Sequence, residues 1–369
     1  MDQFFWIFSV FDRAPLILRN RIVRSATAER FADENGRVGS EAIDLYRTLA
    51  EGGVGLIITG HMYIRQDGKA GAKQSGMFSD DHVDGWKKVC AAVHEIEGAR
   101  IVAQISHAGR QTNSNITGHE VMAPSPIPMR MSGVVPREMT ADEISELDKA
   151  FGKAALRVKQ AGFDGVQLHA AHGYLISQFL SPFTNHREDD WGGTADKRRR
   201  FLFEVFNQVR LRTGNNFPIL TKINGEDLVP GGVTVEETVE TVRQLSDMGL
   251  WGYEISGGIA ESTTKISQKR VAPGNEGYFL NTARRFRVLD SRSVRIVVGG
   301  LRSLPVLEGA VASGDADLVS MSRPLIQEPD LVRRWMAGNS SPSGCISCNQ
   351  CLKDRTGRTY CHEIEALED

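Results

Sequence analysis

Two histidines and a tyrosine lie within six residues of one another, at His169, His172 and Tyr174. They directly follow the apolar segment 163–168, which has the composition of a buried strand. Residues in the loop after a strand are well placed for catalysis. An imidazole can donate a hydrogen bond to a carbonyl oxygen and polarise it, and a phenol can deliver a proton. The sequence therefore predicts that these three side chains form the catalytic centre.

Other roles for the two histidines stay open at this point. The pair could bind a metal ion, act as a general acid and base, or lie in the core as ordinary buried side chains. A His-x-x-His spacing with no nearby carboxylate at ligand spacing is a weak pattern for zinc. Hydrogen-bond donation to a substrate oxygen is the interpretation carried forward.

Short apolar runs alternate with longer amphipathic segments along the whole chain, and this alternation predicts strand-then-helix units. Eight such units favour an α/β fold, a single (β/α)8 TIM barrel at 1–337 followed by a cysteine-rich tail at 338–369. A doubly wound sheet is the alternative, but no G-x-G-x-x-G follows the first strand. The predicted strands are 22–25, 54–60, 100–107, 163–169, 219–224, 252–256, 295–299 and 316–322. The predicted helices are 40–51, 81–97, 141–160, 196–213, 234–248, 281–289, 303–312 and 330–337.

The composition is ordinary for a globular protein and does not favour nucleic-acid binding. Hydrophobic residues make up 41% and charged residues 24%, and the formal net charge is −2. That balance provides no basic face for nucleic acid. No apolar run reaches the roughly 18 residues that a membrane helix needs, and the N-terminus lacks a basic leader. We expect a cytoplasmic homo-oligomer that acts on a small molecule.

The ends of the predicted strands carry small and polar groups that a barrel would gather on its catalytic face. The seventh and eighth strands end in two glycines, a hydroxyl and a guanidinium, which together can bind a phosphate. The alternative is that the glycines only form a turn and the arginine is a surface residue. These residues are Gly299, Gly300, Ser322 and Arg323.

Two polar residues lie inside apolar strands. Gln104 could hydrogen-bond the edge of a heterocycle, or it could be a core amide bonded to backbone. Lys222 is costly to bury unless it meets an anion or a polarised carbonyl, which favours a functional role.

Two long segments, 109–137 and 257–278, interrupt the alternation of strands and helices and should shape a substrate pocket.

Four cysteines are clustered near the end of the sequence in a Cys-x-x-Cys-x-x-Cys pattern followed by one more. The clustering argues for a metal site in a reducing compartment rather than for disulfides. Zinc and an iron–sulfur cluster both accept four thiolates. The predicted ligands are Cys345, Cys348, Cys351 and Cys361.

Taken together, the motifs resemble those of the old yellow enzyme superfamily of flavin-dependent oxidoreductases. The resemblance runs from about residue 15 to the end. It rests on Asn20-Arg21-Ile22-Val23, on 52–57, on Gln104-Ile-Ser-His-Ala-Gly-Arg110, on the segments 161–175 and 179–193, and on Ser322-Arg323-Pro324.

The resemblance implies a TIM barrel that binds FMN without a covalent bond. Residues Ser25, Ala26, Thr27 and Gly60 would line the isoalloxazine, Gln104 would bond its pyrimidine edge, and Lys222 would lie beside flavin N1. The phosphate would bind Gly299, Gly300, Ser322 and Arg323. Lys222 replaces an arginine usual in the family, and Ala28 replaces a threonine or cysteine that tunes the flavin.

The chemistry implied is reduction of a C=C bond conjugated to a carbonyl or thioester. NAD(P)H or a partner protein would reduce FMN, and hydride would then pass to the β-carbon while Tyr174 protonates the α-carbon. His169 and His172 would hold the substrate oxygen. Oxidative amine dehydrogenation and a purely electron-transferring flavin/iron–sulfur protein are the alternatives.

The cysteine run Cys345-Ile-Ser-Cys-Asn-Gln-Cys351 resembles that of the iron–sulfur branch, represented by trimethylamine dehydrogenase and dienoyl-CoA reductase. The resemblance implies a [4Fe-4S] cluster, with zinc as the alternative. Those relatives continue into nucleotide-binding domains, whereas this sequence ends at Asp369, so we expect an external electron carrier to dock near the tail.

Overall fold

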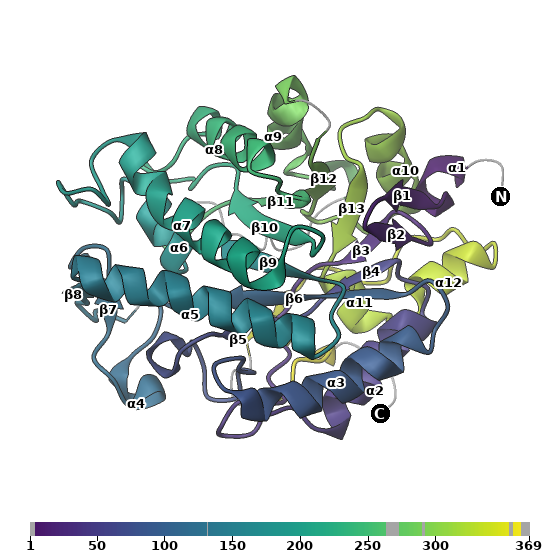
Figure 1. The fold of residues 1–369 in the computed structure, drawn as a ribbon. Coiled ribbons are helices and arrows are strands. Elements are labelled where there is room, and N and C mark those ends of the chain that lie inside the picture. Colours follow the sequence, from purple (N-terminus) through teal and green to yellow (C-terminus); the bar gives the residue numbers. More distant parts are fainter. Residues whose placement is uncertain (1–3, 131, 263–272, 290–291, 354–356, 363–369) are drawn as a thin grey trace.

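A closed barrel of parallel strands forms the centre of the protein (Figure 1). The computed structural model describes residues 4–130, 132–262, 273–289, 292–353 and 357–362. Its main sheet closes because β4 pairs with both β3 and β6, which leaves the short β5 (Met62–Tyr63) outside the ring of eight. The barrel strands are β3 (Ile22–Arg24), β4 (Leu56–Ile58), β6 (Arg100–Ser106), β9 (Gly165–Ala170), β10 (Ile219–Asn224), β11 (Gly252–Ser256), β12 (Val294–Val297) and β13 (Leu318–Met321).

The eight predicted strands and the TIM-barrel fold class are thus confirmed, and each predicted helix is present around the outside of the barrel. The longest helix begins with a capping box in which Thr140 and Glu143 satisfy each other's backbone N–H groups. Within the described residues, every helix is too short or too polar to cross a membrane. These helices are α2 (Ser40–Glu51), α3 (Val83–His94), α5 (Ala141–Gln160), α7 (Ala195–Thr213), α8 (Val235–Asp247), α9 (Leu280–Arg285), α10 (Leu304–Ala312) and α12 (Leu331–Met336).

An N-terminal hairpin that the sequence did not predict covers the amino-terminal end of the barrel. It consists of β1 (Phe11–Arg13) and β2 (Leu16–Leu18) and follows the short helix α1 (Phe5–Phe8). Its side chains join the apolar residues at the bottom of the barrel interior in one buried cluster. The indole of Trp251 donates a hydrogen bond to the Arg13 carbonyl at 3.1 Å, which attaches the hairpin to the start of β11.

The barrel interior changes from apolar to polar along the strands. Alternate residues of a strand face the same side. Val102, Leu220 and Leu318 belong to the apolar cluster under the hairpin, and the residue two positions further along each strand is polar and equally buried. These polar residues are Gln104, Lys222 and Ser320. The polar layer lies toward the carboxyl ends of the strands, where barrel enzymes place their active sites.

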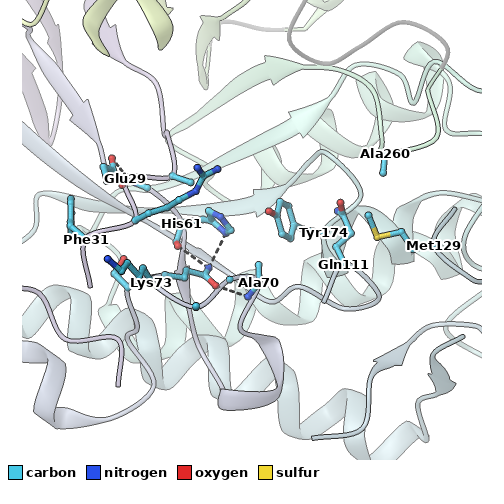
Figure 2. A pocket seen from close by; sticks show the side chains of 16 residues that line it. Glu29, Phe31, His61, Ala70, Lys73, Gln111, Met129, Tyr174 and Ala260 are labelled. Carbon is cyan, nitrogen blue, oxygen red and sulfur yellow. Dashed lines mark hydrogen bonds between the residues drawn. The ribbon is translucent and has the colours of Figure 1, made fainter. Parts of the chain in front are cut away.

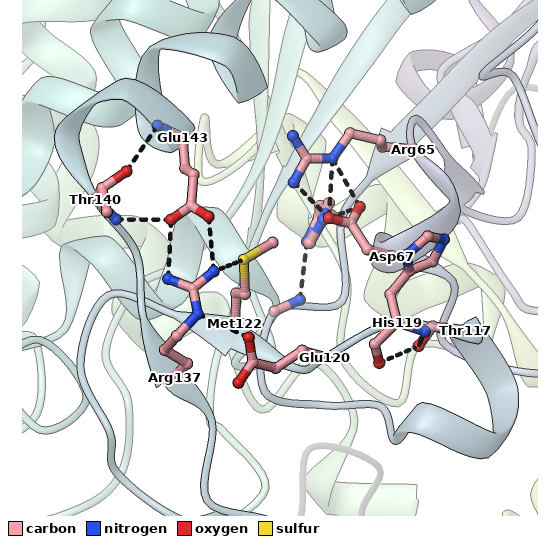
Figure 3. Close-up of polar contacts among 11 residues, drawn as sticks. Arg65, Asp67, Thr117, His119, Glu120, Met122, Arg137, Thr140 and Glu143 are labelled. Carbon is pink, nitrogen blue, oxygen red and sulfur yellow. Dashed lines mark hydrogen bonds and ion pairs between the residues drawn. The ribbon is translucent and has the colours of Figure 1, made fainter.

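Figure 3 shows how the first long segment is attached to the barrel. Arg137 in β8 (Arg137–Glu138) donates to Glu120 at 2.8 Å and to Glu143, the capping residue of α5, at 2.6 Å. The segment also contains α4 (Ser114–Thr117) and β7 (Met122–Ala123), which pairs with β8.

Of the second long segment, residues 263–272 lie outside the described part of the chain, as does residue 131 of the first segment. Two further short helices, α6 (Leu175–Leu180) and α11 (Arg323–Gln327), begin at the strand ends discussed below.

Packing between α5, α6 and α7 should carry a large share of the fold's stability. Phe201 in α7 is fully buried, with its ring 4.3 Å from that of Phe179 and 6.3 Å from that of Phe151. We expect Phe201→Ala to lower the free energy of unfolding by about 3–5 kcal/mol, because it removes a buried ring and leaves a cavity. Urea denaturation would measure this loss. Leu211→Ala in the same helix, at a residue that is 74% exposed, should change stability by less than about 0.5 kcal/mol.

Candidate active site

His169, His172 and Tyr174 come together at the carboxyl end of β9, as predicted for one catalytic centre. The backbone turns sharply after the strand, where His172 has a φ of 62° and Gly173 a φ of 76°. This left-handed conformation is uncommon for a residue with a side chain. The turn brings the ring of His169 to 5.4 Å from that of His172 and 4.7 Å from that of Tyr174.

Neighbouring strands fix His172, while His169 keeps one ring nitrogen available. The His172 Nε2 lies 2.7 Å from Ser256 Oγ at the end of β11, and its backbone N–H donates to Asn224 Oδ1 at the end of β10. His169 is buried, and its Nδ1 has no hydrogen-bond partner among the described residues. Buried polar atoms are normally satisfied, so this nitrogen marks a place where a ligand atom is expected.

A third imidazole, His61, belongs to this group and was not among the predicted site residues. Its ring lies 4.8 Å from Tyr174 and 5.8 Å from His169. Its Nδ1 accepts from Gln74 Nε2 at 3.0 Å and is 3.0 Å from Ser106 Oγ. The proton of the neutral ring is therefore assigned to Nε2. The sequence places His61 directly after the second predicted strand. Gln74, which orients the His61 ring, lies 13 residues further along the chain in a loop.

All three imidazoles are neutral at physiological pH. Burial, assisted by the charge of Arg30, lowers the pKa of His61 to about 4. Burial and the charge of Lys222 lower the pKa of His172 to about 3. Burial and the two other imidazoles hold the pKa of His169 well below its usual value. A neutral imidazole can still donate one hydrogen bond, so these residues can polarise an oxygen without carrying a charge.

A cavity of about 360 Å³ opens beside Tyr174 and His61 (Figure 2). Ligand pockets of enzymes begin at about this volume. Most of its lining comes from residues 28–31 and 70–75, and both long segments contribute to it, as expected if they shape a pocket. The lining includes Gly60, His61, Gln111, Met129, Tyr174 and Ala260.

A second, smaller cavity of about 110 Å³ brings together most of the predicted cofactor-binding residues. The predicted residues in its lining provide an ammonium, a guanidinium, two hydroxyls and a left-handed glycine, which is a donor set that fits a phosphorylated ligand. The shared residues are Ser25, Ala26, Lys222, Gly300, Ser322 and Arg323. This donor set fits the phosphate of a flavin mononucleotide.

The remaining predicted cofactor residues lie close by. Thr27 Oγ1 is 2.7 Å from Ser322 Oγ at the edge of the second cavity. Gly60 lines the first cavity instead. Gly299, with a φ of 132°, packs against Tyr278 and is not part of the second cavity's lining. Gln104 lies deeper in the barrel and is described below.

The four predicted metal ligands, Cys345, Cys348, Cys351 and Cys361, line one small cavity of about 20 Å³. In the part of the chain that the structure describes, no three His, Cys, Asp or Glu side chains are placed to hold one metal ion. The thiols are therefore gathered without being in a ligating arrangement, and the cluster stays a prediction.

The cysteine segment is attached to both cavities. Arg323 donates to Asn349 Oδ1 at 2.6 Å, so a residue of the second cavity holds the cysteine loop. Further along, Thr359 donates from its backbone to the Glu29 carbonyl and from its hydroxyl to the Ala28 carbonyl. Ala28 and Glu29 line the larger cavity.

The structure defines a TIM barrel whose candidate site lies at the carboxyl ends of the strands, and sequence comparison identifies the family. Residues 7–341 match the model of the NADH:flavin oxidoreductase / NADH oxidase family, so the chain belongs to that family. It is 38% identical to the NADH oxidase of Thermoanaerobacter brockii over 95% of this chain and 54% of that protein. The chain thus spans about half the length of this relative.

Solved structures place the same fold in the old yellow enzyme superfamily. A complex of 2-naphthoyl-CoA reductase with 2-naphthoyl-CoA matches with a TM-score of 0.86 and 30% identity, over 94% of this chain and 54% of the other. The old yellow enzyme homologue from Zymomonas mobilis matches with a TM-score of 0.78 and 28% identity, over 93% and 95% of the two chains. The predicted family is confirmed.

The neutral state of His61 should appear in the pH dependence of stability. Its folded pKa lies below the unfolded value of about 6.5, so the unfolded chain gains a proton as the pH falls from 7 to 5 while the folded chain does not. We expect His61→Gln to reduce the loss of unfolding free energy over this range by up to roughly 2 kcal/mol. Urea denaturation at both pH values measures it. His119→Gln, at an exposed loop position, should keep the wild-type slope.

Proposed function

We propose that this chain is an FMN-dependent ene-reductase that reduces the C=C bond of an α,β-unsaturated carbonyl or thioester. The observation that carries the proposal is the meeting of three neutral imidazoles and a phenol beside two cavities, one fit for substrate and one for phosphate. Membership of the flavin oxidoreductase family supports it.

The binding residues would act by position and charge. Lys222, Gly300, Ser322 and Arg323 would hold FMN, with Arg323 and the glycine amide at the phosphate. When bound, FMN supplies the hydride, after reduction by NAD(P)H or by a protein carrier.

The residues around Tyr174 would act on the substrate. His169 and His172 donate hydrogen bonds to the carbonyl oxygen, which stabilises negative charge as it develops there. Tyr174 transfers its phenolic proton to the α-carbon. The ring of His61, whose centre is 4.8 Å from that of Tyr174, would fix the orientation of the phenol by packing against it.

A thioester is the substrate class that the comparisons favour. The structure that matches with a TM-score of 0.86 is a reductase bound to 2-naphthoyl-CoA, an aromatic acyl thioester. Amine oxidation is disfavoured because a cationic amine needs an aromatic cage. Among the described lining residues of the larger cavity, only Phe31 and Tyr174 carry aromatic six-membered rings, and the positive charges of Lys73 and Arg30 outnumber the single carboxyl group of Glu29. Trp251 packs at the opposite end of the barrel.

For the tail from about residue 338, we propose a [4Fe-4S] cluster held by the four cysteines, with zinc as the alternative. The support is their gathering around one cavity next to Arg323, a residue of the proposed phosphate site. Four thiolates are the usual ligands of such a cluster. Electrons would then pass one at a time between the cluster and the flavin, and a carrier protein would dock near the tail.

Replacing Tyr174 by phenylalanine tests the proton donor. We expect about 10²–10⁴-fold slower oxidation of the reduced protein by cyclohexenone or a nitroalkene, because a general acid contributes on that order. Reduction by NAD(P)H or dithionite should be unchanged. Stopped-flow absorbance follows both half-reactions. The control is Tyr253→Phe, which removes a buried phenol that bonds Arg295 on the outside of the barrel. Equal oxidation rates in Tyr174→Phe and the wild type would rule out this role.

The cysteine proposal is tested by metal content. Anaerobically purified protein should contain close to four irons per chain, and Cys351→Ser should lose most of this iron. Cys90→Ser, which changes a buried thiol in α3, should retain it. Iron and zinc assays with a visible spectrum make the measurement. One zinc and no iron would select the alternative, and neither metal would contradict both.

A further inference from the structure

A fully buried carboxylate, Glu254 of β11, lies in the polar layer beneath the two cavities. Its Oε1 accepts from Ser320 Oγ at 2.6 Å, from Ser25 Oγ at 2.7 Å and from Lys222 Nζ at 3.2 Å. Its Oε2 accepts from Gln167 Nε2 at 3.1 Å. Both oxygens are thus satisfied by side chains from four other strands or strand ends.

The network continues from Glu254 to the predicted pyrimidine-binding amide. Gln104 donates from Nε2 to Gln167 Oε1 at 2.7 Å, so the Gln167 amide accepts on one side and donates to Glu254 on the other. Lys222 also donates to Ser25 Oγ at 2.7 Å. Glu254 therefore connects Lys222, Ser25 and Gln104, three residues proposed to contact the flavin, and it does not line either cavity itself.

Glu254 is ionised in this environment. Burial alone would raise its pKa, but the charge of Lys222 and the hydrogen bonds from Ser320, Ser25 and Gln167 outweigh burial and leave the pKa below its usual value. A buried carboxylate and a buried ammonium at 3.2 Å form a pair with no net charge.

We propose that Glu254 is a positioning residue of the flavin site, which holds Lys222 and Gln104 in place and lowers the flavin's reduction potential by partly neutralising Lys222. The inference rests on the proposed FMN function. A positive charge beside a flavin stabilises the reduced, anionic form and raises the potential, and a carboxylate behind that charge opposes the effect. Glu254 does this without contacting the cofactor.

The test uses a background in which the cation cannot be lost. Without its counter-charge, a buried ammonium is costly and can shed its proton, whereas a guanidinium stays protonated. The comparison is therefore between Lys222→Arg and the double variant Lys222→Arg with Glu254→Gln. Potentials are measured anaerobically against reference dyes. We expect the equilibrium between oxidised and reduced flavin to shift at least tenfold toward the reduced form in the double variant. For a two-electron couple this corresponds to a reduction potential about 30 mV higher.

Controls separate this inference from the flavin proposal. Stoichiometric FMN binding by the wild type, with a flavin spectrum, is established first; its absence overturns the proposed function and the inference with it. Given bound FMN, a shift below tenfold in the double variant overturns the effect of charge. Thr221→Val removes a buried hydrogen bond on the same strand outside the network and should not move the potential.

A second variant tests the positioning role on its own, including the case in which the double variant does not fold. Gln167→Met keeps the side-chain length but removes both hydrogen bonds that connect Glu254 to Gln104. We expect FMN to bind at least tenfold more weakly, as measured by fluorescence titration of the apoprotein. Unchanged affinity would show that Gln104 does not depend on the network and would overturn that half of the proposal.

Discussion

The buried ion pair between Lys222 and Glu254 constrains the half of the barrel that lies toward the carboxyl ends of the strands. Two opposite charges can be buried away from water only if they contact each other and if their remaining lone pairs and protons form hydrogen bonds. Ser25, Ser320 and Gln167 meet that requirement from other strands. The hydrogen bonds of the pair therefore require one register between the strands. In that register Lys222 lies opposite Glu254 on one side and His169 on the other, so it also fixes the position of His169 along the barrel.

Above this layer the site works with neutral groups. Burial holds the imidazoles of His61, His169 and His172 without charge, so the fixed positive charges at the two cavities come from basic side chains, such as Arg30 at the larger cavity and Arg323 at the smaller one. Such an arrangement can stabilise a negative charge that appears only during the reaction. It avoids the cost of burying several cations permanently.

The sequence was sufficient to predict the barrel, its strands and which polar residues lie at the carboxyl ends of these strands, because these depend on local patterns and on the order of elements. Helix α5 was predicted to the residue by its capping box and its apolar period. The N-terminal hairpin was missed because neither of its strands is followed by a helix, so the alternation of strand and helix gives no sign of it. His61 and Glu254 were missed for another reason: their roles depend on partners such as Gln74 and Gln167, which no spacing in the sequence places beside them.

The hydrogen bonds from Thr359 to Ala28 and Glu29 join positions that are 331 and 330 residues apart in the sequence. During synthesis the first βα loop leaves the ribosome long before its partner does. Folding that proceeds from the N-terminus can therefore close the barrel sheet only after β13, and can complete this wall of the larger cavity only later still. A newly made chain would therefore pass through a stage in which the barrel is formed while the Ala28 and Glu29 carbonyls, in the wall of the larger cavity, still lack their hydrogen bonds from Thr359.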